Sequence, residues 1–190
     1  MKKNNTRNTI IGLVILAAAV LAIFLLAINT PDKQADSVQI TAATKQLAKN
    51  YDTAYPSTPR TVVSEYGEIT KCFYASDTTE DQIKDLAVQM RQLFDDELVA
   101  NQSFDDFYDA LRSEIAVYRD KNKIVSSYSV SSSTDVKYEN NEYGSMASLY
   151  LSLSVRENGV IDVVKEHFIL RQDEEGHWKI LGWVLAGEDE

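Results

Sequence analysis

Cysteine, histidine and proline are scarce in this chain, which contains one, two and three of them among 190 residues. The lone cysteine, Cys72, excludes an intrachain disulfide. Two histidines and one cysteine are too few for an ordinary zinc site. The acidic runs at 95–97 and 105–106 lack the alternating oxygen ligands and the glycine turn of a calcium loop. We therefore expect no metal and no cofactor.

Basic residues are outnumbered and unevenly placed. Lys2, Lys3 and Arg7 precede residue 31, and the remaining 16 basic residues face all 29 acidic ones, a formal charge of −13. Binding to nucleic acid or to anionic lipid headgroups depends on clustered lysine and arginine. The composition therefore argues against nucleic acid as a partner.

One apolar run, residues 9–28, contains no charged residue. At about 1.5 Å per residue, a helix of this length matches the ~30 Å hydrocarbon layer of a bilayer. Residues 1–8 form a basic tail, and positive charge stays on the cytoplasmic side. We expect a single-pass protein of the cell membrane, with its N-terminus inside and its domain outside. The alternative is a cleaved signal peptide, although the run is long for one and residues 26–30 lack a small-x-small site.

Residues 29–57 form a polar spacer, which contains one short stretch with helical spacing from Ile40 to Tyr51. Three amphipathic helices are expected from residue 58 onward, where the domain begins. Thr58, Thr79 and Ser103 are their capping residues, and the second helix extends to residue 101.

From residue 124 the apolar period changes from 3.6 to 2, which indicates strands. We expect strands over 124–138, 147–155, 161–171 and 177–186, with turns at 140–141, at Asn158-Gly159 and at 173–176. Gly182 inside the last strand indicates a bulge or bend. Helices followed by strands predict an α+β fold, in which the helices pack on one face of a four-stranded antiparallel meander.

The last strand reads Gly-His-Trp-Lys-Ile-Leu-Gly-Trp over residues 176–183. Together with the preceding helices, it resembles the nuclear-transport-factor-2-like (cystatin-like, SnoaL-like) superfamily. That resemblance implies a cone of about three helices against a curved sheet, and a homodimer through the open sheet face. Residues 55–60 (Tyr-Pro-Ser-Thr-Pro-Arg) and 69–74 (Ile-Thr-Lys-Cys-Phe-Tyr) resemble a family of membrane-anchored proteins of unknown function from anaerobic Firmicutes. The stretch at 99–103 is too short for the hairpin that many superfamily members insert there.

The superfamily includes isomerases and dehydratases, which use an acid or a histidine that faces the cavity. The matching groups here are Asp162, Glu166 and His167, but none lies in a catalytic motif. Their proton-donor partners would be tyrosines, namely Tyr66, Tyr108, Tyr128 or Tyr150. Strand alternation puts Glu166 and His167 on opposite faces of the sheet. We therefore expect no catalytic residues.

A cavity lined by aromatic side chains is the best ligand site that the sequence offers. Its candidate residues are Tyr66, Phe73, Phe94, Phe107, Tyr128, His167, Trp178 and Trp183. The overall interpretation is a membrane-anchored extracytoplasmic module, non-catalytic, that binds a protein or an envelope component. The alternative is a small-molecule cavity binder, or an isomerase-like enzyme of the same fold.

Overall fold

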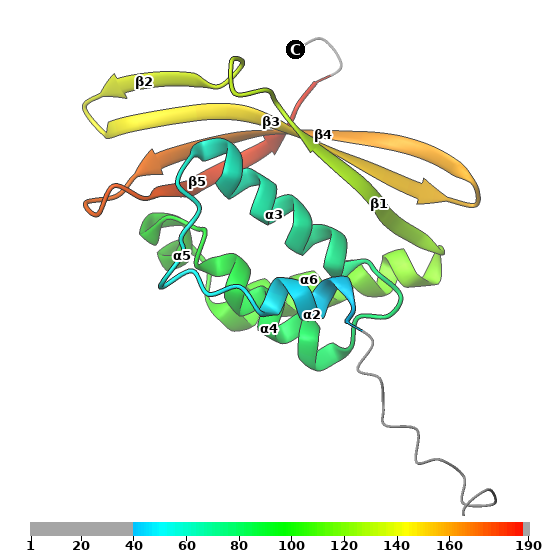
Figure 1. Ribbon diagram of the computed structural model, residues 1–190. Coiled ribbons are helices and arrows are strands. Elements are labelled where there is room, and N and C mark those ends of the chain that lie inside the picture. Colours follow the sequence, from blue (N-terminus) through cyan, green and yellow to red (C-terminus); the bar gives the residue numbers. More distant parts are fainter. Residues whose placement is uncertain (1–39, 188–190) are drawn as a thin grey trace, which may run out of the picture. The chain divides into compact units, whose positions relative to one another are not determined.

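The computed structural model describes residues 40–187, which form five helices followed by a five-stranded antiparallel sheet (Figure 1). The expected order, helices first and strands afterwards, is confirmed. In chain order the elements are α2 (Ala42–Leu47), α3 (Pro59–Phe73), α4 (Glu80–Arg91), α5 (Asp96–Asn101), α6 (Phe104–Asp120), β1 (Lys123–Val130), β2 (Lys137–Asn141), β3 (Gly144–Glu157), β4 (Val160–Gln172) and β5 (Trp178–Leu185).

All three predicted helix caps are present. The Thr58 side chain accepts a hydrogen bond from the backbone N–H at the third position of α3. Thr79 and Gln82 form a reciprocal capping box at the start of α4, and Ser103 caps α6. Each cap satisfies a backbone donor that has no partner inside the helix.

The second predicted helix is interrupted, which corrects the expectation that it would extend to residue 101. α4 ends at Arg91, and the chain then forms a short parallel bridge in which Phe94 pairs with Ile180 of β5. The Asp95 N–H donates to the Ile180 carbonyl at 2.8 Å. The Asp95 side chain then caps the short helix α5. This change of direction depends on a contact with a strand far along the chain, which helical periodicity cannot reveal.

The first predicted strand is also divided, so the sheet has five strands instead of four. β1 and β2 both pair with β3, and the strand order otherwise is β1-β3-β4-β5. Between them the Ser132 hydroxyl donates to the Asp135 carboxylate at 2.9 Å, a local bond that competes with strand pairing. The following turn lies after Asn141, which pairs with Gly144, and not at residues 140–141.

The other two strand signals are confirmed. Asn158 and Gly159 both have positive φ angles, 49° and 86°, as a tight hairpin turn requires. Ile169 pairs with Gly182 while Leu170 pairs with Ile180, so the ladder between β4 and β5 contains the bulge that Gly182 indicated.

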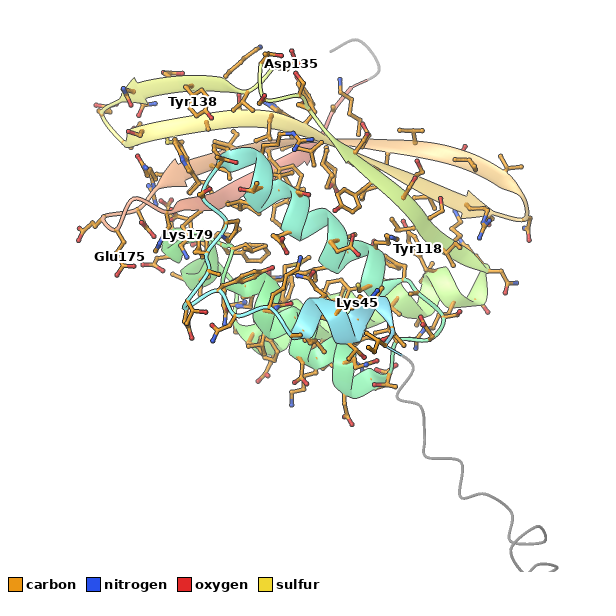
Figure 2. All side chains as sticks on the ribbon, viewed as in Figure 1. Lys45, Tyr118, Asp135, Tyr138, Glu175 and Lys179 are labelled. Atoms are coloured by element: carbon orange, nitrogen blue, oxygen red, sulfur yellow. The ribbon has the colours of Figure 1, made fainter. Side chains whose placement is uncertain are left out.

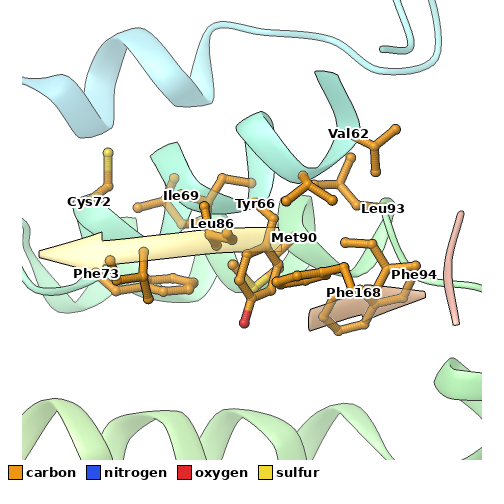
Figure 3. Packing of buried hydrophobic residues seen from close by; sticks show 14 of the residues in the cluster. Val62, Tyr66, Ile69, Cys72, Phe73, Leu86, Met90, Leu93, Phe94 and Phe168 are labelled. Atoms are coloured by element: carbon orange, nitrogen blue, oxygen red, sulfur yellow. The ribbon is translucent and has the colours of Figure 1, made fainter. Parts of the chain in front are cut away.

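The helices cover one face of the sheet, and α3 lies directly against it (Figure 1). The covered face of β3 carries the alternating residues Ala147, Leu149, Leu151, Leu153 and Val155, all buried. Figure 3 shows how α3, α4 and β4 contribute to this core. Cys72 lies inside it, as expected for a small buried thiol.

The packed unit begins at Ile40, so residues 40–57 are part of it, although the sequence indicated a spacer there. Gln46 of α2 is buried and donates to Tyr51 and to Glu65 of α3, at 2.9 and 3.0 Å. Within residues 40–187, no helix combines the length and the apolar character needed to cross a bilayer. The predicted basic tail and anchor, residues 1–28, lie outside the described residues.

Candidate functional site

A pocket of about 240 Å³ lies between α3, α6 and the end of β5. Four of the eight predicted cavity residues line it: Tyr66, Phe73, Phe107 and Trp183. The other lining residues are Thr70, Tyr74, Met90, Gln102, Ala110, Leu111 and Glu114. The wall is therefore mainly aromatic and aliphatic, with a few polar groups, which is the usual composition of a small-molecule site.

The aromatic wall is held together by ring contacts between α3 and the covered face of the sheet. The Tyr66 ring lies 4.9 Å from that of Phe168 and 5.3 Å from that of Trp183, measured between centroids. Phe168 and Trp183 stack with a centroid distance of 5.7 Å. Because Phe168 and Trp183 pair across β4 and β5, the sheet register fixes the floor of the pocket.

Polar groups gather at the end of the pocket where Glu114 lies on α6. Glu114 is exposed at the rim. Burial raises the pKa of the Tyr74 hydroxyl, and the charge of Glu114 and a hydrogen bond with it raise that pKa further. Burial, then the charges of Glu166 and Glu114, raise the pKa of Tyr66 well above its ordinary value. Both tyrosines are therefore neutral hydrogen-bond donors beside carboxyl groups.

Glu166 is the most perturbed carboxyl group near the pocket. It lies on the covered face of β4, two residues before Phe168, and its Oε2 atom is buried without a hydrogen-bond partner. Burial, and then the charge of Glu114, raise its pKa to about 7. Burial also raises the pKa of Tyr118, which Figure 2 labels toward the C-terminal end of α6, and the charges of Glu114 and Glu166 raise it further. The carboxyl group of Glu166 thus carries a proton over part of the neutral pH range.

The remaining four predicted cavity residues lie elsewhere. Phe94 packs behind the pocket, 5.9 Å from Phe107 and 5.7 Å from Trp183. Tyr128 lies on β1, where its hydroxyl is 3.3 Å from that of Ser64.

Trp178 and His167 belong to other parts of the sheet. The Trp178 ring contacts the Tyr138 ring at 5.7 Å. His167 lies on the uncovered face and stacks on Tyr150 at 4.6 Å. His167 therefore lies on the side of the sheet away from the helices, whereas Trp178 shares the covered face with Ile180 but lies outside the pocket.

The groups considered for catalysis do not converge. Glu166 lies on the covered face and His167 on the uncovered face, as strand alternation predicted. Asp162 is exposed, and Tyr108 stacks on Phe104 of the same helix. Of the tyrosine donors considered, Tyr66 lines the pocket, and burial and then the charge of Glu166 raise its pKa.

Larger hollows occur on the surface, and some of the charged groups in their walls already have partners. One of about 520 Å³ contains Asp95 and Arg171, joined by a hydrogen bond of 3.0 Å from the Arg171 Nε atom. Another of about 460 Å³ contains Lys179, whose Nζ atom lies 4.2 Å from the centre of the Tyr55 ring. In residues 40–187, no group of three or more His, Cys, Asp or Glu side chains is placed to hold a metal ion.

A family model matches residues 1–183, which is nearly the whole chain. The chain belongs to the family described as a domain of unknown function, DUF6715. No curated protein matches it. The DUF6715 description names no activity, so the residues of the pocket are the basis for assigning a function.

Several pocket residues of this DUF6715 chain were not predicted from the sequence, above all Tyr74 and Glu114. Glu114 precedes the buried Ile115 and lies beside the apolar stripe of α6, which is a weak signal for a polar group at a rim. Tyr74 is the residue after α3, where no periodicity applies. Neither position could be assigned to a pocket without the packing of α6 against α3.

Proposed function

We propose that this chain is a non-catalytic binding module, anchored in the cell membrane by residues 9–28, whose domain lies outside the cytoplasm. We further propose that its domain is nuclear-transport-factor-2-like and takes a small amphipathic molecule in the pocket between α3 and α6. The observation that carries the binding function is the pocket itself, an aromatic hollow of about 240 Å³ with the carboxyl group of Glu114 at its rim. Since a water occupies about 30 Å³ of liquid, this hollow has room for about eight waters or a ligand of similar size.

The fold proposal is supported by an antiparallel sheet with helices on one face and by the final strand, which follows Gly176 with Trp178 and Ile180. The short helix α5 occupies the position where many members of that superfamily insert a hairpin.

The proposed membrane topology can be tested with protease on intact cells and on spheroplasts. We expect the domain to be digested from outside, and the chain to stay with the membrane fraction after an alkaline wash. A mature protein that begins beyond residue 28 and leaves the membrane in that wash contradicts the anchor and supports the signal peptide.

Native mass spectrometry tests the pocket. The full-length protein, released gently from its own membrane, should carry a small bound mass. Phe107→Ala should lose that mass because Phe107 lines the pocket. Phe104→Ala is the matched control, since Phe104 lies on the same helix and stacks on Tyr108 instead. A bound mass retained by the Phe107 variant, or absent from the wild type, contradicts pocket binding.

A protein partner on the uncovered sheet face is a second candidate, favoured by a row of exposed apolar side chains there. Ile161 and Val163 of β4 are 60% and 66% exposed, and Val184 of β5 is 61% exposed. A second copy of the chain is one such partner, in line with the homodimer that the fold resemblance implies.

This second candidate is tested by the mass of the detergent-solubilised protein from light scattering. Val163→Lys should dissociate a dimer or release a co-purifying protein. Val88→Lys is the control, because Val88 is exposed on α4, away from the sheet. A monomer without a co-purifying protein in the wild type rules this candidate out.

A further inference from the structure

We propose that the pocket between α3 and α6 takes an organic ammonium ion with an apolar body. In this arrangement Glu114 is the direct counter-ion at the rim, and Glu166 is a second carboxyl group beyond the pocket wall. The proposal rests on the proposed function, because it names the ligand class of the same pocket.

Two carboxyl groups from different elements act on the pocket. Glu114 of α6 lines the rim, whereas Glu166 of β4 is not part of the lining and acts through Tyr66. Both act on the hydroxyl of Tyr66, which is itself part of the wall. The Glu166 Oε2 atom is buried and has no hydrogen-bond partner. A buried acceptor without a partner is unfavourable, and a bound cation nearby offsets that cost.

The remaining wall suits an apolar body attached to the charge. Tyr66, Phe107 and Trp183 present aromatic rings to the pocket. The face of an aromatic ring attracts a cation through its quadrupole, and aromatic rings also pack well against hydrocarbon. An ammonium ion with a short alkyl or aryl chain therefore matches both ends of the pocket.

Nearby cationic side chains have other partners, so they do not neutralise the two glutamates. The Arg91 guanidinium faces the Phe107 ring at 5.7 Å and donates to the carbonyls of Val99 and Gln102. Lys123, whose charge lowers the pKa of Tyr118, forms an ion pair of 2.8 Å with Glu157.

The groups around Glu166 determine how its proton responds to a ligand. Tyr66 faces it from α3, and Glu114 and Tyr118 face it from α6; within the sheet its direct neighbours are Leu151 and Leu185. The tyrosines are neutral, so Glu114 is the one charged group among them. Burial is the main cause that keeps Glu166 protonated, and the charge of Glu114 adds to it. A cation beside Glu114 therefore offsets the second of these two causes and favours release of the proton.

The predicted pH dependence is about tenfold. With a pKa of about 7 in the free protein, Glu166 is ionised in about one molecule in eleven at pH 6 and in about ten in eleven at pH 8. If the cation binds the ionised form, its apparent affinity should rise by that ratio, about tenfold between pH 6 and pH 8. An alkylammonium probe stays charged throughout this range, since such amines titrate near pH 10.

Isothermal titration of the full-length protein in non-ionic detergent tests the proposal, with phenethylammonium chloride as the probe and 2-phenylethanol as its neutral counterpart. We expect the ammonium to bind at least about tenfold more tightly than the alcohol at pH 8. Glu114→Gln should remove that preference, and Glu166→Gln should remove the pH dependence. Asp109→Asn is the matched control: it removes one negative charge from the exposed side of α6 and should change neither.

Each contrary result has a distinct meaning. Equal affinity for the ammonium and the alcohol overturns the ligand class and leaves the proposed small-molecule function intact. Ammonium binding that neither glutamate variant changes places the cation elsewhere and overturns the inference. No binding of either probe also overturns it, and the proposed function then falls only if native mass spectrometry of the wild type shows no small bound mass.

Discussion

Replacing Glu166 with glutamine should make the protein more stable at pH 8 and leave it nearly unchanged at about pH 4, below the ordinary pKa of a glutamate. In the folded chain the pKa of Glu166 is raised to about 7, above its ordinary value of 4.5. Between pH 4.5 and about pH 7, the folded state therefore binds more protons than the unfolded state. It follows that the contribution of Glu166 to stability falls as the pH rises through this window, and glutamine has no such dependence.

The size of the effect follows from the displacement of the pKa. A displacement of this size corresponds to roughly 3 kcal/mol of unfolding free energy for a fully buried group. Glu166 is only partly buried, so solvent screening reduces the expected value to about 2 kcal/mol. For a chain of this length, that is a difference of about 4–8 °C in the midpoint of thermal unfolding.

The measurement is the midpoint of thermal unfolding for wild type and Glu166→Gln, at intervals from about pH 4 to pH 8. The difference between the two proteins isolates Glu166 from other titrating groups, such as Glu65. Burial raises the pKa of Glu65, but hydrogen bonds from Lys49, Gln46 and Tyr51 outweigh it and lower that pKa overall. Glu142→Gln, in an exposed turn, is the control. A difference between wild type and Glu166→Gln that stays constant with pH refutes the reasoning.

Three further predictions concern the core and a buried ion pair, and thermal unfolding tests the first two. Gly67→Ala should destabilise the protein by about 1–3 kcal/mol, because a Cβ atom there would lie 2.7 Å from the Tyr128 ring; stability equal to wild type contradicts this close approach. Asp95→Ala should cost about 2–4 kcal/mol by leaving Arg171 without its buried carboxylate, and the double variant with Arg171→Met should recover part of the loss. Cys72 should react with iodoacetamide at pH 8 only after denaturation, because burial raises its pKa to about 11; fast labelling of the folded protein would show that its surroundings open readily.

Local signals account for the parts of the fold that the sequence predicted correctly. Thr58, Thr79 and Ser103 cap their helices through hydrogen bonds within three residues, and Asn158-Gly159 forms its turn through its own backbone angles. These interactions join residues that are close together in the sequence, so a local sequence pattern can reveal them.

The errors occurred where distant segments decide the local structure. The backbone of residues 93–95 leaves the helical path because it pairs with Ile180 of β5. Of the predicted aromatic residues, Tyr66 and Trp183 meet in the pocket, whereas His167 points to the other face. The alternation of side chains along β4 correctly placed His167 and Glu166 on opposite faces of the sheet. Which other side chains each of them meets depends on whether helices cover that face.

The position of α5 explains why a pocket remains although the chain has no room for an inserted hairpin at 99–103. Arg91, at the end of α4, donates to the carbonyls of Val99 and Gln102, at 3.2 and 3.0 Å. These bonds satisfy carbonyls that have no partner at the end of a helix, and they hold α5 against α4. Gln102 thereby becomes part of the pocket wall beside Phe107. Gln102, which follows this six-residue helix, thus supplies part of the pocket wall without an inserted hairpin.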